Sequence, residues 1–207
     1  MIVCDDCDFQ LNPVWPGEFN DEYSCPICGI SYEWNKDKNQ YTRIKTMRSD
    51  WDKAIEFVLR MEGEYTLDPD DPGGETMYGI SKKAYPSIDI KSLTIEDAKS
   101  IYLRDYWIPC NCDDLPSAFA ICVFDTAVNM GTGKAKRMLQ MALDVEVDGI
   151  IGSETLSAAS KAGRSRVRKY LALRLAEYSR IMATNINLLK YSLNWSYRVL
   201  HLMDAVN

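Results

Sequence analysis

Residues 60–65 read Arg60-Met61-Glu62-Gly63-Glu64-Tyr65, at the point where a helical pattern ends. Hydrophobic residues upstream recur at helical spacing and form one stripe: Trp51, Ala54, Ile55, Val58 and Leu59. Glu62 lies four residues after Val58 and continues this stripe with a carboxyl group. Gly63 is typical of a helix end. The sequence therefore predicts a helix over residues 46–63 that carries Glu62 in its last turn.

The position of Glu62 favours acid chemistry. Partial burial and the negative end of the helix dipole both disfavour a carboxylate anion. A carboxyl group that stays protonated near neutral pH can act as a general acid. The alternative is a terminal helix glutamate that turns out to solvent and has no chemical role.

The segment after Glu62 is rich in Asp, Pro and Gly. It reads Asp68-Pro69-Asp70-Asp71-Pro72-Gly73-Gly74-Glu75-Thr76-Met77-Tyr78-Gly79-Ile80. This composition predicts turns and a small hairpin that folds back over the helix end and forms one wall of a cleft. A general acid at Glu62 would work with a second group that stabilises a developing positive charge or activates water. The leading candidates are Asp71 and Asp70, followed by Glu75 and Thr76, and the alternative for the aspartates is local turn chemistry.

These residues resemble glycoside hydrolase family 108, a family of lysozyme-like peptidoglycan hydrolases with a Glu-Gly-Gly-Tyr motif. Here Glu64 stands where that family has its second glycine. The resemblance covers residues from about 50 to the C-terminus. Further matching segments are Tyr106-Trp107, Cys112-Asp113-Asp114-Leu115-Pro116, Phe124-Asp125-Thr126-Ala127-Val128-Asn129-Met130-Gly131 and Asp148-Gly149-Ile150-Ile151-Gly152. Several segments in the same order are more specific than one short motif.

The resemblance implies a mainly α, lysozyme-like domain with a small β-hairpin lobe, in which Glu62 is catalytic. The candidate catalytic residues are then Glu62, Asp71, Asp70 and Thr76. The candidate substrate-binding residues are Tyr65, Glu75, Tyr78, Asp125 and Asn129. For Asp125 and Asn129, which lie one helical turn apart, a pair of satisfied core polar groups is the alternative. Residues 139–155 look like a peptidoglycan-binding module.

Four cysteines near the N-terminus have the spacing C-x2-C-x17-C-x2-C: Cys4, Cys7, Cys25 and Cys28. This spacing is typical of a structural zinc site with four thiolate ligands. About forty residues cannot build a sufficient core without such a metal, so residues 1–45 are predicted to be a zinc ribbon. The alternatives are two disulfides or four idle thiols. The remaining cysteines, Cys110, Cys112 and Cys122, are interpreted as ordinary reduced thiols.

The rest of the chain is predicted to be helical. Helices are expected over residues 94–107, 116–129, 134–143, 154–162, 164–183 and 188–203, and the second of these is the expected central buried helix. The predicted division is a zinc ribbon over 1–45, a catalytic domain over 46–130, and a helical peptidoglycan-binding-like region over 131–207.

Composition limits the partners. The net charge of −6 disfavours nucleic-acid binding, although residues 151–207 alone carry 3 acidic and 9 basic residues. The sequence has no long apolar run and no export signal at its start, so we expect no membrane span and a cytoplasmic location. We expect a monomer. The one histidine, His201, excludes a zinc amidase built on several histidines and makes a Cys-His peptidase improbable.

The resemblance, together with these exclusions, implies an N-acetylmuramidase that cleaves the β-1,4 bond between N-acetylmuramic acid and N-acetylglucosamine. Its partner is the glycan strand of peptidoglycan, and its catalysis needs no cofactor. The resemblance implies a phage endolysin that reaches the wall through a holin. The alternatives are a lytic transglycosylase on the same bond, and a non-enzymatic wall-binding or secretion-accessory protein.

Overall fold

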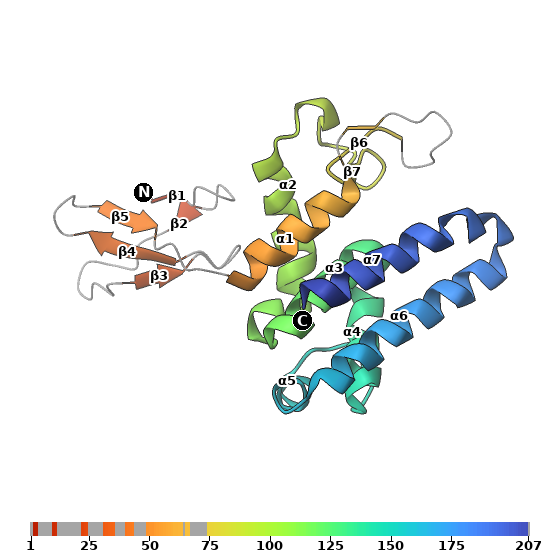
Figure 1. The fold of residues 1–207 in the computed structure, drawn as a ribbon. Helices are drawn as coiled ribbons and strands as arrows, with labels where there is room; N and C mark the ends of the chain where they lie inside the picture. Colours follow the sequence, from red (N-terminus) through yellow and green to blue (C-terminus); the bar gives the residue numbers. More distant parts are fainter. Residues whose placement is uncertain are drawn as a thin grey trace.

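The computed structural model describes residues 2–3, 10–11, 22–24, 31–35, 40–43, 49–63, 65–66 and 74–206. The described part is mainly helical with a small antiparallel hairpin, as predicted. The α-helices are α1 (Ser49–Glu62), α2 (Ile95–Tyr102), α3 (Ser117–Met130), α4 (Thr132–Leu143), α5 (Ser153–Ser160), α6 (Arg164–Thr184) and α7 (Ser192–Ala205). Figure 1 shows α6 and α7 running side by side along one flank of α3.

Short strands precede the first helix. They are β1 (Ile2–Val3), β2 (Gln10–Leu11), β3 (Glu22–Ser24), β4 (Ser31–Asn35) and β5 (Gln40–Arg43). β1 pairs with β2, and β3, β4 and β5 form an antiparallel sheet in that order. The four cysteines of the predicted zinc ribbon lie outside the described residues, so the ribbon stays a prediction.

Helix α1 agrees with the sequence pattern. Ala54, Ile55 and Val58 are buried, and Gly63 follows the helix with a φ of +76°. A positive φ is readily adopted only by glycine, which explains why the helix stops there. The carboxylate of Asp50 accepts a hydrogen bond from the Ser117 hydroxyl at 2.6 Å, which ties the start of α1 to the start of α3.

Helix α2 begins with a capping box, as its sequence indicates. The Thr94 hydroxyl accepts a hydrogen bond from the Asp97 backbone at 3.2 Å, and the Asp97 carboxylate accepts one from the Thr94 backbone at 3.0 Å. The helix continues as one π-helical segment, η2 (Leu103–Trp107), and then as short 3-10 turns, η3 (Ile108–Cys110) and η4 (Cys112–Asp114). A further 3-10 turn, η1 (Ile90–Ser92), precedes α2.

Helix α3 is the centre of the core. Every residue from Phe119 to Ala127 is buried, and α1, α4 and α6 pack around it. Aromatic rings join α1, η2 and α3, because Trp51 lies edge-on to Trp107 and to Phe124 with centroid distances of 5.3 Å. Such edge-to-face contacts add to the free energy gained from burial. The prediction of a central buried helix is confirmed.

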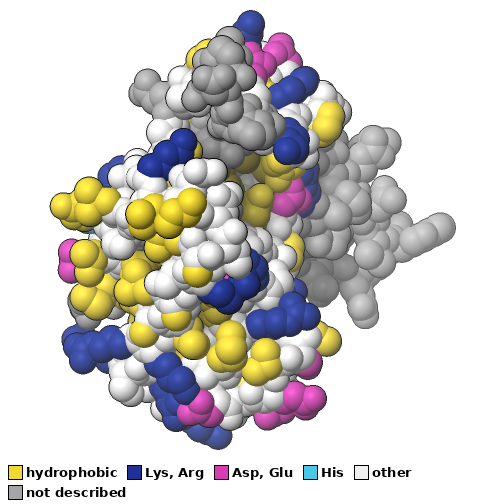
Figure 2. All heavy atoms as spheres, turned by 90° about the vertical axis from the view of Figure 1, so that its right-hand side faces the viewer, with side chains coloured by type: hydrophobic (Ala, Val, Ile, Leu, Met, Phe, Trp, Pro, Cys, Tyr) yellow, Lys and Arg dark blue, Asp and Glu magenta, His cyan; other side chains and the backbone are white. Residues whose placement is uncertain are grey.

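The C-terminal helices differ from the pattern in one respect. Leu189, Leu193, Tyr197 and Leu200 are at helical spacing, yet they are 52–62% exposed. Leu189 lies in the 3-10 segment η5 (Ile186–Tyr191), and the other three lie on α7. The buried face of α7 is instead made by Arg198, Val199 and Leu202. Hydrophobic side chains lie among Lys and Arg on the face in Figure 2, which is the right-hand side of Figure 1. No helix within the described ranges is long and apolar enough to cross a membrane.

Candidate active site

Glu62 is the last residue of α1, and its side chain is 23% exposed. The helix delivers it to the edge of the core because the preceding turns bury Ile55 and Val58. A carboxyl group in this position is held by the fold but remains partly accessible. The structure therefore keeps Glu62 as the leading candidate for acid chemistry.

A two-stranded hairpin packs against Glu62. It consists of β6 (Thr76–Met77) and β7 (Ile80–Ser81), joined by a turn through Tyr78 and Gly79. The side-chain carbons of Glu62 lie so close to the backbone of Gly79 that a Cβ there would be 2.8 Å from Cγ of Glu62. The Tyr102 hydroxyl donates to the Tyr78 carbonyl at 2.8 Å and fixes the turn to α2. The predicted fold-back over the helix end is thus present for the described part of this segment.

A cluster of four charged side chains begins at Glu62. Nη1 of Arg198 donates to Oε1 of Glu62 at 2.7 Å, while Nε and Nη2 of Arg198 donate to Oδ1 of Asp125 at 2.9 and 2.7 Å. Arg174 donates to the other oxygen of Asp125. The charges therefore alternate from Arg174 through Asp125 and Arg198 to Glu62. The hydrogen bond from Arg198 is charge-assisted and holds the carboxyl group of Glu62 in one place.

Asp125 is completely buried, and both its oxygens accept hydrogen bonds from arginines. Burial alone would raise the pKa of Asp125, but the charges of Arg174 and Arg198 and their hydrogen bonds outweigh it and hold that pKa below its usual range. This side chain has no surface for contact with a glycan. Of the two interpretations left open by the sequence, the structure favours a satisfied core polar group for Asp125.

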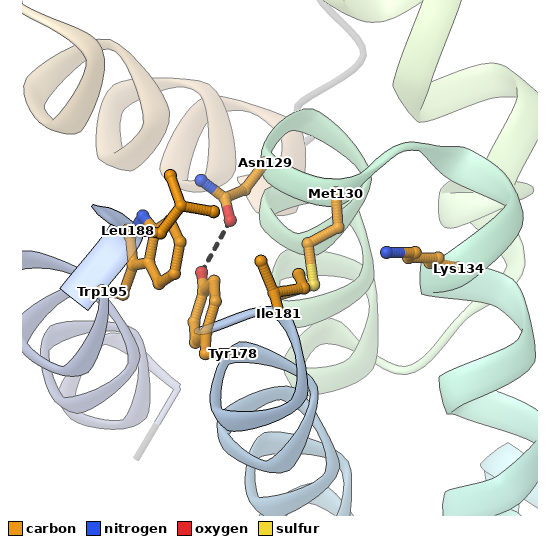
Figure 3. Close-up of a pocket in the computed structure, with 7 residues that line it drawn as sticks. All are labelled: Asn129, Met130, Lys134, Tyr178, Ile181, Leu188 and Trp195. Atoms are coloured by element: carbon orange, nitrogen blue, oxygen red, sulfur yellow. Dashed lines mark hydrogen bonds between the residues drawn. The ribbon is translucent and has the colours of Figure 1, made fainter. Parts of the chain in front are cut away.

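Asn129 lies one turn further along α3 and is half-buried. Its side-chain oxygen accepts a hydrogen bond from the Tyr178 hydroxyl at 2.6 Å, and Tyr178 also accepts one from Nε of Arg174 at 3.1 Å. Asn129 lines a pocket of about 390 Å³ together with Met130, Lys134, Tyr178, Ile181, Leu188 and Trp195. Figure 3 shows Asn129 and Tyr178 directed toward each other beside Trp195, whose ring stacks on Tyr178 at 4.7 Å. Direct sugar binding by Asn129 stays a prediction.

Tyr65, Glu75 and Thr76 lie at the open end of the hairpin, whereas Tyr78 lies in its turn. The Tyr65 hydroxyl donates to Glu75 at 2.8 Å, and Lys91 lies 3.7 Å from the same carboxylate oxygen. The Thr76 hydroxyl donates to the carbonyl of Gly74 at 3.3 Å. Thr76 also pairs through its backbone with Thr66, which brings the two sides of the segment together. Tyr78 is half-buried with a φ of +51°.

Asp70 and Asp71, the leading candidates for the second carboxylate, lie outside the described residues, as do Cys4, Cys7, Cys25 and Cys28. The remaining cysteines, Cys110, Cys112 and Cys122, are free and buried. Burial raises the pKa of the Cys122 thiol to about 12, which makes it unreactive. His201 is exposed and stacks on Tyr197 at 6.2 Å, so it behaves as a surface histidine.

Two segments of the chain match known protein families. Residues 55–131 match the Glycosyl hydrolase 108 family. The glycosyl hydrolase match includes Glu62, Gly79 and Asp125. Residues 134–199 match a second family, described as Predicted Peptidoglycan domain, and this match includes Arg174 and Arg198. The two matches together support hydrolase activity toward peptidoglycan.

A solved structure, that of Brucella abortus SagA, is similar to this chain. The two share 29% sequence identity with a TM-score of 0.66. The aligned region covers 77% of this chain and 94% of the SagA chain. A search among curated proteins finds no match.

Sequence reasoning missed Arg174, Arg198 and the close approach of Gly79. A signal for Arg198 was present, because Trp195, Arg198, Val199 and Leu202 also recur at helical spacing. These residues form the inner face of α7, with an arginine where a hydrophobic residue is expected. A buried arginine indicates a buried carboxylate partner, because an unpaired charge is costly in the interior.

Proposed function

We propose that this protein is a lysozyme-like N-acetylmuramidase that hydrolyses the β-1,4 bond between N-acetylmuramic acid and N-acetylglucosamine, with Glu62 as general acid. The observation that carries the proposal is the placement of Glu62. Its partly exposed carboxyl group ends α1, lies against the β6–β7 hairpin and contacts Arg198. It belongs to the segment that matches a glycosyl hydrolase family, and a peptidoglycan domain match follows.

In the proposed reaction, Glu62 transfers its proton to the glycosidic oxygen as the bond from that oxygen to the anomeric carbon breaks. The sugar passes through an oxocarbenium-like transition state, which a second carboxylate stabilises or hydrates. Asp71 and Asp70 follow Glu62 closely in sequence and remain our candidates for this role. Water supplies the hydroxyl group of the product and returns a proton to Glu62.

We further propose that the protein is an endolysin made in the host cytoplasm that reaches the wall through a holin. The supporting observation is the peptidoglycan domain match. The proposed zinc ribbon of residues 1–45 supplies structure in this scheme, because four thiolates fill the coordination shell of the metal.

The decisive experiment compares the wild type with Glu62→Gln for clearing of purified sacculi. Glutamine keeps the shape of the side chain but has no acidic proton, so we expect a loss of at least about 100-fold with folding and sacculus binding retained. Glu56→Gln is the matched control, because Glu56 is an exposed residue of the same helix. A folded Glu62→Gln protein that clears sacculi at the wild-type rate would disprove the proposed site.

Analysis of the released fragments distinguishes the remaining candidates. A muramidase leaves reducing muramic acid ends, whereas a lytic transglycosylase leaves anhydromuramic ends. The transglycosylase is a second candidate because the carboxylate linked to Glu62 through Arg198 is that of Asp125. Two arginines already bind Asp125, so it does not serve as a second catalytic carboxylate. Its mechanism needs a single glutamate that acts first as acid and then as base. Binding of sacculi without any clearing would indicate the non-enzymatic alternative.

A further inference from the structure

One guanidinium group connects the two segments that match different families. Arg198 on α7 contacts Glu62 on α1 through Nη1, and Asp125 on α3 through Nε and Nη2. Glu62 and Arg198 are separated by 136 residues in the chain. Arg198 lies within the peptidoglycan domain match, which ends at residue 199 inside α7, yet this arginine reaches the proposed catalytic acid. The C-terminal segment therefore has a structural connection to catalysis as well as to binding.

Arg198 is held in place where it contacts Asp125. Arg198 is 9% exposed along its side chain, and Asp125 is 1% exposed and also bonded to Arg174. Burial by itself would lower the pKa of Arg198, but the carboxylates of Asp125 and Glu62 raise it above its usual value. Arg198 thus remains a cation with a fixed orientation. A planar guanidinium holds two partners in a fixed geometry, whereas the donors of a lysine ammonium rotate and fix no such geometry.

Glu62 is consequently restrained at two points. Its Cβ and Cγ atoms lie against the backbone of Gly79, and its Oε1 atom accepts a hydrogen bond from Arg198. Among the residues that the structure describes, none donates a hydrogen bond to Oε2. A proton on Oε1 would face the N–H of Arg198 and break this bond, so the free position for a proton is Oε2.

We propose that Arg198 is a positioning residue that occupies Oε1 of Glu62 and reserves Oε2 for proton transfer, so that the peptidoglycan domain segment completes the active site. This inference rests on the proposed role of Glu62. Its consequence is that residues 55–131 alone lack a part of the site. Activity depends on α7 through one hydrogen bond, separately from any contribution of the C-terminal segment to wall binding.

The test compares Arg198→Met and Arg198→Lys with the wild type in the full chain. Both variants are examined for melting temperature, for sacculus binding, and for kcat and KM on solubilised glycan strands. We expect kcat to fall by about 10- to 100-fold in Arg198→Met, because a small displacement of a catalytic group has an effect of this size. KM and sacculus binding should stay within about twofold, since uniform substrate binding is unchanged. Arg168→Met, at an exposed site on α6, is the matched control.

The Arg198→Lys variant separates positioning from a purely structural role. Lysine keeps a cation beside Asp125 but lacks the fixed planar fork of the guanidinium. We therefore expect the melting temperature of Arg198→Lys to return toward that of the wild type, while kcat stays reduced because Oε1 of Glu62 is no longer held in place.

The proposal is overturned if folded Arg198→Met has the wild-type kcat. If this variant does not fold, Arg198→Lys carries the test, and a wild-type kcat there overturns the proposal. A double variant with Glu62→Gln adds an independent measure: a residue that acts through Glu62 should cause no further loss of kcat. Full activity of Glu62→Gln would disprove the proposed function itself, whereas inactive Glu62→Gln with normal Arg198 variants disproves only this inference.

Discussion

Gly79 lies directly against Glu62, although the two residues belong to different elements of the fold. A Cβ atom on Gly79 would lie 2.8 Å from Cγ of Glu62 and 2.4 Å from the hydroxyl oxygen of Tyr102. Gly79 also has a φ of +79°, a conformation that other residues rarely adopt. The hairpin can therefore approach the end of α1 only through a residue that has no side chain.

We expect Gly79→Ala to lower the free energy of unfolding by roughly 1–3 kcal/mol, because it adds backbone strain and a steric clash. It should also slow the clearing of sacculi by displacing Glu62. Gly74→Ala is the control, because Gly74 has a φ of +71° but no atom within 4 Å of a Cβ. Urea unfolding measures both variants. Equal losses of stability in Gly79→Ala and Gly74→Ala would show that the contact between Gly79 and Glu62 does not contribute to stability.

Substitution of Asp125 should be strongly destabilising. We expect Asp125→Asn to cost about 3–5 kcal/mol, because it leaves the buried cations Arg174 and Arg198 without a compensating charge. Asp204→Asn, at an exposed position, should change the free energy of unfolding by less than about 0.5 kcal/mol. Urea unfolding at neutral pH gives both values. A loss below about 1 kcal/mol for Asp125→Asn would contradict the charge cluster.

The same residue predicts how stability depends on pH. The pKa of Asp125 in the folded protein lies below its ordinary value of 3.8, because the two arginines outweigh the effect of burial. Its contribution is therefore fully present above about pH 3.8 and is lost as the pH falls toward the folded pKa. Between pH 5 and pH 2, roughly, the wild type should lose stability more steeply than Asp125→Asn. Parallel curves would mean that the ion pairs do not hold in solution.

The second carboxylate is tested at two adjacent positions. We expect either Asp70→Asn or Asp71→Asn to lower turnover by about 100-fold or more, as removal of a catalytic carboxylate does. Melting temperature and sacculus binding should change little, since asparagine is the closest neutral analogue of aspartate. If both variants turn over normally, the partner of Glu62 is another group, and Glu75 is then the first to substitute.

The ribbon prediction concerns metal content. We expect about one zinc ion per chain, with four sulfur ligands at ~2.3 Å in X-ray absorption spectra. Removal of the metal by a chelator should unfold residues 1–45 and leave the melting of the helical part unchanged. Cys4→Ser should lose the zinc, whereas Cys110→Ala should retain it. If Cys110→Ala loses the zinc instead, the metal is not held by residues 1–45 and the ribbon prediction is wrong.

Local features of the helical part were available from the sequence. The periodicity of residues 51–62 placed Glu62 on the inner face of α1, and Gly63 marked its end, since both signals act within a few turns of one helix. The capping box at Thr94 and Asp97 is equally local. Residues 117–130 are apolar on all sides, which already indicated a helix surrounded by others.

The environment of Glu62 was decided only by tertiary structure. Its cationic partner Arg198 lies 136 residues away, and no local pattern encodes which distant side chains will meet. On α7 the spacing of Leu193, Tyr197 and Leu200 indicated an apolar face equally well, but the fold left that face outside and buried the one with Arg198. Sequence spacing describes the distribution of residues around one helix, whereas the face that becomes buried depends on the side chains of the neighbouring helices. Here α3 carries the buried carboxylate of Asp125, and Arg198 on the buried face of α7 pairs with it.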